Sequence, residues 1–250
     1  MNDTPLILID GASSGIGKET VLKLNKEGFK TVGIARRSEK LEELKASCPF
    51  PDLFSYEIRD LGSDVASLSD FVDSLVAKYG KFSGFVHAAG VLNQQPVKMI
   101  DFDDLLSDFN TNLFSALFII KGLIRKRNRQ SHLNIVLVSS IAAKIGNPGS
   151  VTYGMTKAAM NNLVTSLAQE VGGTNIHLNA VMPGGTKTEM AEYYNNSLPY
   201  DYLEKCREKN VFHKDGLPEY IADVIAFLLS EKSYWIQGQS ITVDGGETLS

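Results

Sequence analysis

The 250-residue sequence has little cysteine: two residues, Cys48 and Cys206. They are isolated and show no metal-ligand spacing, so the sequence excludes a disulfide scaffold and predicts no metal site. This cysteine usage is typical of a reducing compartment. An excess of one charge is also lacking, because the net formal charge is −4. That balance argues against a global attraction to nucleic acid or to an anionic membrane.

Long hydrophobic runs are absent as well. The longest apolar patch, LFSALFII at 113–120, is far too short to span a bilayer. The amino-terminal MNDTPLILIDGASSG has an acidic residue before a very short apolar run, which is not the pattern of a signal peptide. We therefore expect a cytoplasmic protein without a membrane partner. Its 43% apolar and 22% charged residues are the balance of an ordinary globular protein.

One basic cluster, RKRNRQ at 125–130, raises the question of nucleic-acid binding. A single cluster that closes a helix more often caps the dipole at the helix's carboxyl end and faces solvent. We therefore predict no nucleic-acid partner.

Short apolar runs alternate with longer amphipathic stretches along the whole chain. Strands are predicted at 6–10, 31–35, 53–58, 84–89, 134–140, 176–182 and 240–244. Helices are predicted near 15–27, 38–46, 63–79, 101–129, 151–171 and 217–230. Several strands are apolar on both faces, as in a parallel sheet covered by helices. The pattern predicts a single α/β domain over 1–250: a Rossmann-like, doubly wound sheet of about seven parallel strands with helices on both faces.

The segment 188–216 departs from this alternation, because it is polar, aromatic-rich and long. Ligands bind outside the carboxyl ends of the strands in open α/β sheets, so an insertion after a late strand is well placed to be a substrate lid. The segment contains four tyrosines and two asparagines that bear on this prediction: Tyr193, Tyr194, Tyr200, Tyr202, Asn195 and Asn196. These side chains suit a sugar, a polyol or a polar ketone, and suit a surface or a subunit contact equally well.

The first predicted strand leads into a glycine-rich turn and then a helix. Glycines allow the backbone to turn sharply and to approach a pyrophosphate, while the helix N-terminus presents free N–H groups and the positive end of its dipole. The spacing is Gly-x-x-x-Gly-x-Gly, which differs from the common Gly-x-Gly-x-x-Gly. We predict that a dinucleotide binds here, through Gly11, Ser13, Ser14, Gly15, Ile16 and Gly17.

The second predicted strand ends in two arginines, Arg36 and Arg37, with no carboxylate until Glu39. An acid near this position binds the ribose 2′-hydroxyl of NAD, whereas an arginine accommodates the 2′-phosphate of NADP. The planar, permanently charged guanidinium suits a phosphate. We therefore predict a preference for NADP(H), with NAD(H) possible; the alternative is that both arginines begin a solvated loop.

The stretch SVTYGMTKAAM at 150–160 carries Tyr153 and Lys157 four residues apart. Four residues are about one helical turn, so both side chains lie on one face. A phenol has a pKa of about 10, too high for ready proton exchange near neutrality, and a cation beside it stabilises the phenolate. The spacing therefore predicts an acid and its activator.

The ordered motifs resemble those of the classical short-chain dehydrogenase/reductase family over nearly the whole chain: GASSGIG (11–17), RDL (59–61), HAAG (87–90), NTNLF (110–114), VSS (138–140), YGMTK (153–157), NAVMPGGTKTEM (179–190) and GQSITVDGG (238–246). Tyr153 and Lys157 with Ser140 thirteen residues upstream make the match specific. The resemblance implies hydride transfer between NADP(H) and a carbonyl or secondary alcohol.

The resemblance also implies residue roles. Tyr153 is the general acid/base, Lys157 also reaches the nicotinamide ribose, and Ser140 orients the carbonyl. Asn112 matches the asparagine of the proton relay. The further cofactor positions implied are Asp60 and Leu61 at the adenine, Ala88, Ala89 and Gly90 after the fourth strand, and Pro183, Gly184, Thr186 and Thr188 at the nicotinamide end.

Two positions depart from the family's pattern. Asp10 stands where the family usually has Thr, and His87 replaces the Asn that usually opens the fourth-strand motif. Both positions are largely architectural in the family, and we expect His87 to be a hydrogen-bonded core histidine. Ser139 competes with Ser140 for the hydroxyl role, but side chains alternate along a strand, so only one can face the site.

Two alternatives remain open at this point. The motifs TKTEM and VDGG are similar to those of 3-oxoacyl-acyl-carrier-protein reductases, whose partner is an acyl carrier protein thioester, but a second basic residue near 171–177 is lacking. A non-catalytic NADP(H)-sensing module would have lost the tyrosine or the lysine. The family is commonly tetrameric, so a homo-oligomer is expected.

Overall fold

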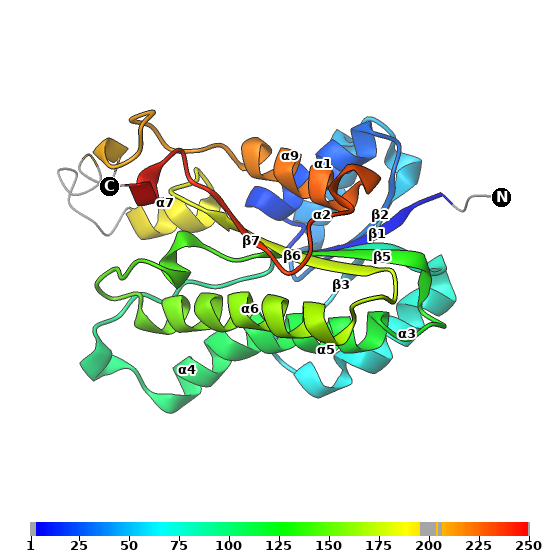
Figure 1. Cartoon of the computed structure of the whole chain (residues 1–250), viewed down its shortest axis with the longest axis horizontal. Helices are drawn as coiled ribbons and strands as arrows, with labels where there is room; N and C mark the ends of the chain where they lie inside the picture. The colour runs from blue at the N-terminus through cyan, green and yellow to red at the C-terminus, as the bar shows by residue number, and fades with distance from the viewer. Residues whose placement is uncertain (1–3, 196–203, 205–206, 250) are drawn as a thin grey trace.

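The computed structural model describes residues 4–195, 204 and 207–249. Within them a parallel sheet has the order β3-β2-β1-β4-β5-β6-β7 (Figure 1). The strands are β1 (Leu6–Asp10), β2 (Lys30–Ala35), β3 (Phe54–Ile58), β4 (Phe82–His87), β5 (Arg129–Val138), β6 (Ile176–Pro183) and β7 (Ser240–Val243). Each neighbouring pair is parallel. The predicted class, doubly wound with seven parallel strands, is confirmed.

Helices cover both faces of the sheet (Figure 1). One layer contains α1 (Gly15–Lys26), α2 (Ser38–Ser47) and α9 (Pro218–Leu229). The other contains α3 (Leu68–Tyr79), α4 (Phe102–Phe109), α5 (Ser115–Leu123) and α6 (Val151–Glu170). Alternation along β1 explains the two layers, because Leu8 packs into the core beside α3 and α5 while Ile9 packs into the core beside α1 and α9.

The predicted helix at 101–129 is wrong in its length and continuity. The chain forms α4, then a π-helical turn at Asn110–Phe114, then α5, which ends at Leu123. Arg129 already begins β5. The predicted helix at 63–79 starts later, at Leu68, after a short 3₁₀ turn at Val65–Ser67.

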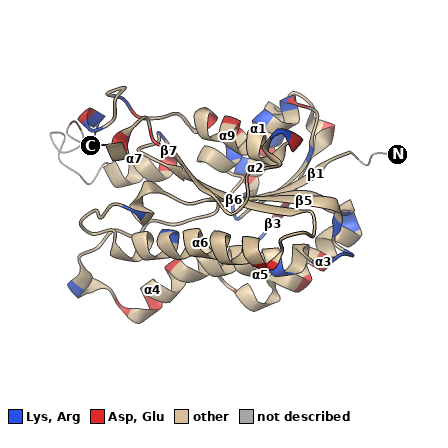
Figure 2. Ribbon diagram, viewed as in Figure 1, with Lys and Arg blue, Asp and Glu red and all other residues tan. Residues whose placement is uncertain are grey.

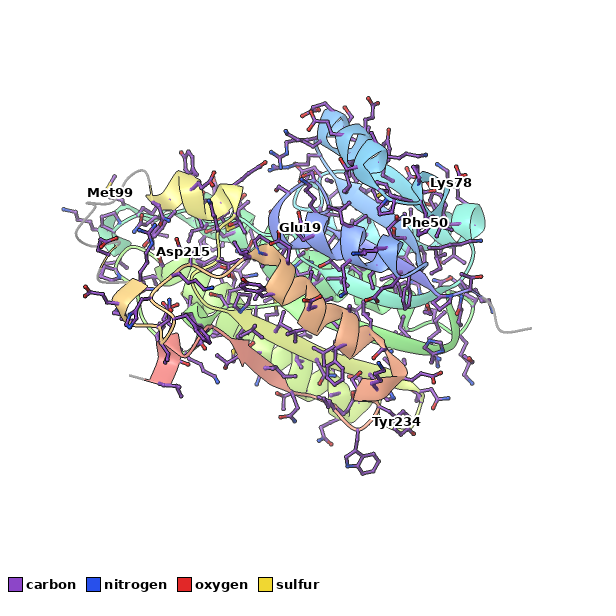
Figure 3. All side chains as sticks on the ribbon, turned by 90° about the horizontal axis from the view of Figure 1, so that it is seen from above. Glu19, Phe50, Lys78, Met99, Asp215 and Tyr234 are labelled. Carbon is purple, nitrogen blue, oxygen red and sulfur yellow. The ribbon has the colours of Figure 1, made fainter. Side chains whose placement is uncertain are left out.

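The carboxyl ends of the strands face the side of the molecule where α7 (Glu189–Asn195) lies (Figure 1). Figure 3 shows Met99 and Asp215 toward this edge, and Phe50 and Lys78 toward the opposite one. Charged residues of both signs are spread along the ribbon of the outer elements (Figure 2). Among the described residues no helix is long and apolar enough to cross a membrane.

Candidate active site

The strand order reverses between β1 and β4, and the glycine turn after β1 lies at this point. Gly11 has φ +61°, and a Cβ on it would lie 2.6 Å from the backbone of Ala88 and Ala89. The turn therefore requires glycine both for its conformation and for its close approach to the end of β4. Ser14 precedes α1 without a side-chain cap, which leaves first-turn N–H groups available to a phosphate.

Two arginines, Arg36 and Arg37, follow β2 and line a cavity that the glycine turn also lines. Nη1 of Arg36 lies 3.9 Å from the Asp60 carboxylate. Arg37 donates to Ser13 Oγ at 3.1 Å and to Glu189 Oε2 at 2.8 Å. Both guanidinium groups line the cavity beside the glycine turn. The positive charge is thus placed where the sequence predicts a 2′-phosphate.

Tyr153 and Lys157 lie one turn apart on α6. The Lys157 ammonium is 5.5 Å from the centroid of the Tyr153 ring and donates to the Val138 backbone carbonyl at 2.7 Å. Ser140, just after β5, lines the cavity with both residues. The predicted catalytic residues, two on α6 and one just after β5, therefore line the same cavity.

The acid–base properties of the pair differ from the simple expectation. Burial lowers the pKa of Lys157 to about 8, while the charge of Asp10 acts in the opposite direction. Burial raises the pKa of Tyr153, and only the hydrogen bond with Ser140 lowers it. In this structure burial therefore dominates the pKa of the phenol, contrary to the prediction that Lys157 lowers it.

The two serines after β5 have different surroundings. Ser139 is buried, and its hydroxyl donates to the backbone carbonyl of Lys157 at 3.1 Å. Ser140 Oγ accepts a hydrogen bond from Ala142 N and remains half-buried at the cavity. This difference agrees with the choice of Ser140 over Ser139 for the hydroxyl role.

The cavity has a volume of about 530 Å³. It is lined by most of the predicted site: Gly11, Ser13, Ser14, Gly15, Ile16, Arg36, Arg37, Asp60, Leu61, Ala88, Ala89, Gly90, Ser140, Tyr153, Lys157, Pro183, Gly184, Thr186 and Thr188. Two predicted residues do not line it. A Cβ on Gly17 would lie 2.4 Å from Gly11 O, so this glycine allows α1 to pack against the turn. Asn112 lies beneath the cavity surface.

The buried Asn112 amide forms hydrogen bonds with two different segments beneath the cavity. Its Oδ1 accepts from Val91 N at 2.7 Å. Its Nδ2 donates to Val91 O at 2.9 Å and to Thr156 Oγ1 at 3.2 Å. Asn112 therefore connects the segment after β4 to the helix that carries Tyr153 and Lys157.

Sequence reasoning missed several residues that fold back onto the cavity. The carboxylate of Glu247, near the chain's end, accepts from Gly185 N at 2.9 Å, and burial raises its pKa. Leu92 and Ile145 also line the cavity, and no local pattern identifies these two residues or Glu247, because their position depends on the packing of distant segments. The lining also includes four residues of the predicted lid 188–216: Met190, Arg207, Lys209 and Asp215.

The two ends of the predicted lid, 188–216, lie next to each other. Thr186 and Gly216 form an isolated bridge, and Gly216 N donates to Gly185 O at 2.8 Å. The described part includes α7, where Tyr194 and Asn195 line the cavity while Tyr193 is 84% exposed. Tyr200, Tyr202 and Asn196, which the sequence suggested as lid residues, lie outside the described residues.

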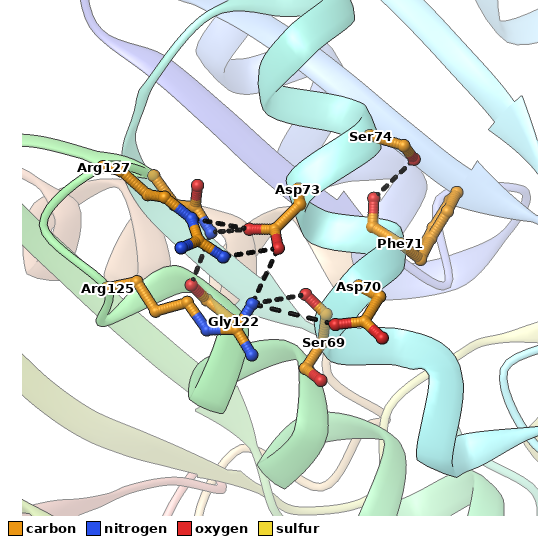
Figure 4. Close-up of polar contacts among 9 residues, drawn as sticks. Ser69, Asp70, Phe71, Asp73, Ser74, Gly122, Arg125 and Arg127 are labelled. Atoms are coloured by element: carbon orange, nitrogen blue, oxygen red, sulfur yellow. Dashed lines mark hydrogen bonds and ion pairs between the residues drawn. The ribbon is translucent and has the colours of Figure 1, made fainter.

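The basic cluster at 125–130 forms an ion-pair network and part of a strand. Arg125 and Arg127 each lie 2.8 Å from the Asp73 carboxylate of α3 (Figure 4). The pKa of Asp73 is lowered, chiefly by its hydrogen bond with Arg127. The predicted helix-capping role was wrong for these two arginines; Arg129, in β5, donates weakly to Ile124 O at 3.4 Å. In the described chain, no cluster of three or more His, Cys, Asp or Glu residues is arranged to hold a metal.

Comparison with known proteins places the chain in a family. The family model described as enoyl-(acyl carrier protein) reductase matches residues 11–248. The 3-oxoacyl-acyl-carrier-protein reductase of Thermotoga maritima is 32% identical over 240 residues, with 96% of each chain covered. The 7alpha-hydroxysteroid dehydrogenase of Bacteroides fragilis is 29% identical, with 99% of this chain and 95% of the relative covered.

A solved structure described as ElxO with NADP bound has a TM-score of 0.88 and 27% identity, covering 99% of this chain and 100% of the other. The chain belongs to the short-chain dehydrogenase/reductase family. It is an NAD(P)-dependent oxidoreductase of that family, acting on carbonyl or alcohol groups.

Proposed function

We propose that the protein reduces a carbonyl, or oxidises the corresponding secondary alcohol, with NADP(H) and with Tyr153 as the general acid/base. The observation that carries this proposal is the shared cavity: Ser140, Tyr153 and Lys157 line the same space as the glycine turn and the two arginines. Proton transfer and cofactor binding can therefore occur at adjacent positions.

The cavity residues fit a dinucleotide with a 2′-phosphate. The backbone of the glycine turn and the first turn of α1 would hold the pyrophosphate. Arg36 and Arg37 would hold the 2′-phosphate, because each guanidinium offers several donors to its oxygens. When bound, the nicotinamide supplies or accepts the hydride.

The chain's own residues would manage the proton and the carbonyl. The Ser140 hydroxyl would donate to the substrate oxygen, where negative charge develops. Tyr153 would donate its phenolic proton to that oxygen during reduction and recover it during oxidation. Lys157 would bind the ribose through its ammonium, a contact for which its hydrogen bond to Val138 O orients it.

A second, narrower proposal is that the substrate is a 3-oxoacyl thioester, free or carried by an acyl carrier protein. The similarity to the Thermotoga maritima reductase favours it. Three apolar side chains of the cavity lining would suit an acyl chain: Leu92, Ile145 and Met190. Independently of the substrate, we also propose a cytoplasmic location and a homo-oligomeric assembly.

A substrate panel tests both proposals. Consumption of NADPH would be followed by absorbance with acetoacetyl thioesters, a 7-oxosteroid, keto sugars and simple ketones. Turnover of any carbonyl that is lost in Tyr153→Phe supports the general proposal, and a clear preference for acetoacetyl thioesters supports the narrower one. Binding of NADPH without turnover of any substrate would favour the sensing module instead.

A further inference from the structure

A buried acid–histidine pair lies directly beneath the candidate active site. Ile9 of β1 pairs with Val86 of β4, so the next residues, Asp10 and His87, end the two strands side by side. Both side chains are fully buried. His87 Nδ1 lies 2.7 Å from Asp10 Oδ2, and His87 Nε2 lies 3.1 Å from the backbone carbonyl of Asn112.

The hydrogen-bond partners determine where the protons lie. A carbonyl oxygen can only accept, so His87 Nε2 must carry a hydrogen. Asp10 Oδ1 accepts from the N–H groups of Ala88 and Ala89, each at 2.7 Å. Its other oxygen, Oδ2, shares a short hydrogen bond with His87 Nδ1. All four polar side-chain atoms of the buried pair therefore have a partner, as buried polar groups require.

This pair contacts both segments that frame the catalytic groups. Asp10 holds Ala88 and Ala89, which line the cofactor end of the cavity. His87 holds the carbonyl of Asn112, which lies in the π-helical turn at 110–114, where the regular helical bonding is interrupted. Through the Asn112 amide the same turn holds Thr156, the residue before Lys157.

The pair also contributes to the electrostatics around Lys157. The ammonium is buried, with Tyr153 on its own helix and Asp10 and His87 on the neighbouring strands. The Asp10 carboxylate acts to favour the charged form of Lys157 against the effect of burial.

We propose that Asp10 and His87 are positioning residues: their buried hydrogen-bonded pair fixes the Asn112 turn, and through it the helix that carries Lys157, against the Ala88–Ala89 segment. This inference rests on the proposed role of Lys157 in binding cofactor. It assigns a role in the reaction to the two positions at which the chain departs from the family's pattern.

Three substitutions separate the parts of this proposal. Asp10→Asn removes the carboxylate charge. His87→Asn retains a donor near the Nδ1 position and loses the bond to Asn112, while His87→Gln places its donor near the Nε2 position and loses the bond to Asp10. The matched control is Ser83→Ala, because Ser83 bonds Leu6 N at 3.0 Å and thus links the same two strands at their other end.

The first measurement is the pH dependence of the NADPH dissociation constant. We expect binding to weaken above about pH 8 in the native protein, as Lys157 loses its proton. Asp10→Asn should move this alkaline limb, the pH range over which binding weakens, to lower pH by about 0.5–1 unit, because it removes the carboxylate that favours the charged form of Lys157. Each His87 variant should instead raise the NADPH dissociation constant about three- to tenfold at pH 7, because it breaks one of the two contacts of the imidazole. Ser83→Ala should leave the limb in place while lowering the melting temperature.

The second measurement does not depend on Lys157. Nitrogen-15 NMR of the four histidine side chains at pH 7, with His87 identified by its loss in His87→Asn, should show a hydrogen on His87 Nε2, as its bond to the Asn112 carbonyl requires. A bare Nε2 would overturn that contact. A limb that stays fixed in Asp10→Asn, with NADPH affinities of all three variants like that of Ser83→Ala, would reduce the pair to a structural role. A native protein without an alkaline limb but with a hydrogen on Nε2 would contradict the role of Lys157 instead.

Discussion

Arg37 and Glu189 are 152 positions apart in the sequence, yet Arg37 Nη1 lies 2.8 Å from Glu189 Oε2 at the edge of the cavity. The ion pair joins the residues after β2 to the first residue of α7. Because Arg37 is also proposed to bind the 2′-phosphate, Glu189 competes with the cofactor for the same guanidinium.

Removing this competition should tighten NADPH binding. We expect Glu189→Gln to lower the NADPH dissociation constant about two- to fivefold and to leave that of NADH unchanged, since an exposed ion pair contributes only about 0.2–1 kcal/mol. Glu43→Gln is the matched control, because it breaks an exposed ion pair with Lys40 on α2, outside the cavity lining. An equal change for both cofactors would contradict the competition.

The predicted preference for NADP(H) depends on Arg36 and Arg37. Native protein should bind NADPH more tightly than NADH, and Arg36→Asp should erase or invert the preference, because it replaces a cation by a carboxylate at the proposed 2′-phosphate site. Calorimetric titration with both cofactors measures this. Equal dissociation constants in the native protein would refute the assignment.

The buried ammonium of Lys157 should reduce stability at neutral pH. Its pKa in the folded protein is about 8, below the value of 10.5 expected for an unfolded chain. Folding is therefore penalised in full below pH 8, and the penalty disappears as the pH rises from about 8 to 10.5. We expect Lys157→Met to raise the free energy of unfolding by about 1–3 kcal/mol at pH 7, with a smaller gain at pH 10.

Urea unfolding at the two pH values measures that difference. The gain is partly offset because the Val138 carbonyl loses its donor. A variant less stable than the native protein at pH 7 would show that this hydrogen bond outweighs the cost of burying the charge. Loss of NADPH affinity in the same variant is expected from the proposed ribose contact.

The α7 segment offers a test of the substrate end. Tyr194 lines the cavity, and its hydroxyl accepts a hydrogen bond from Gln94 at 3.1 Å, whereas the neighbouring Tyr193 is 84% exposed. Tyr194→Ala should change the Michaelis constant or the choice of substrate about three- to tenfold and spare NADPH affinity. Tyr193→Ala should change neither. Equal kinetic effects of the two substitutions would contradict the proposed placement of α7 over the substrate.

The fold was largely predictable because its signals are local. Most strands contain a short apolar run, and β1 was predicted at its observed bounds, whereas the polar first half of β5 was not predicted as strand. The exception shows the limit of such signals: the region 101–129 reads as one continuous helix. The π-helical turn that interrupts it is stabilised by the tertiary contacts of Asn112, which hydrophobic spacing does not reveal.

The candidate site was predictable where residues act in sequence motifs, and not where distant segments meet. Tyr153, Lys157 and the glycine turn follow from spacing. Glu247 and Arg207 reach the cavity only through the packing of the chain's last third. The hydrogen bond between His87 and the Asn112 carbonyl could not be predicted either, because it depends on the path of the backbone through the π-helical turn.

The most direct test of the account is the comparison of Tyr153→Phe with the native protein in two assays. Phenylalanine removes the phenolic proton and keeps the ring, so turnover of every accepted carbonyl substrate should fall at least about 1000-fold. The NADPH dissociation constant should change less than about threefold, because the proposed cofactor contacts come from Lys157, the arginines and the glycine turn. Substantial turnover by Tyr153→Phe on an accepted substrate would contradict the assignment of Tyr153 as the general acid/base.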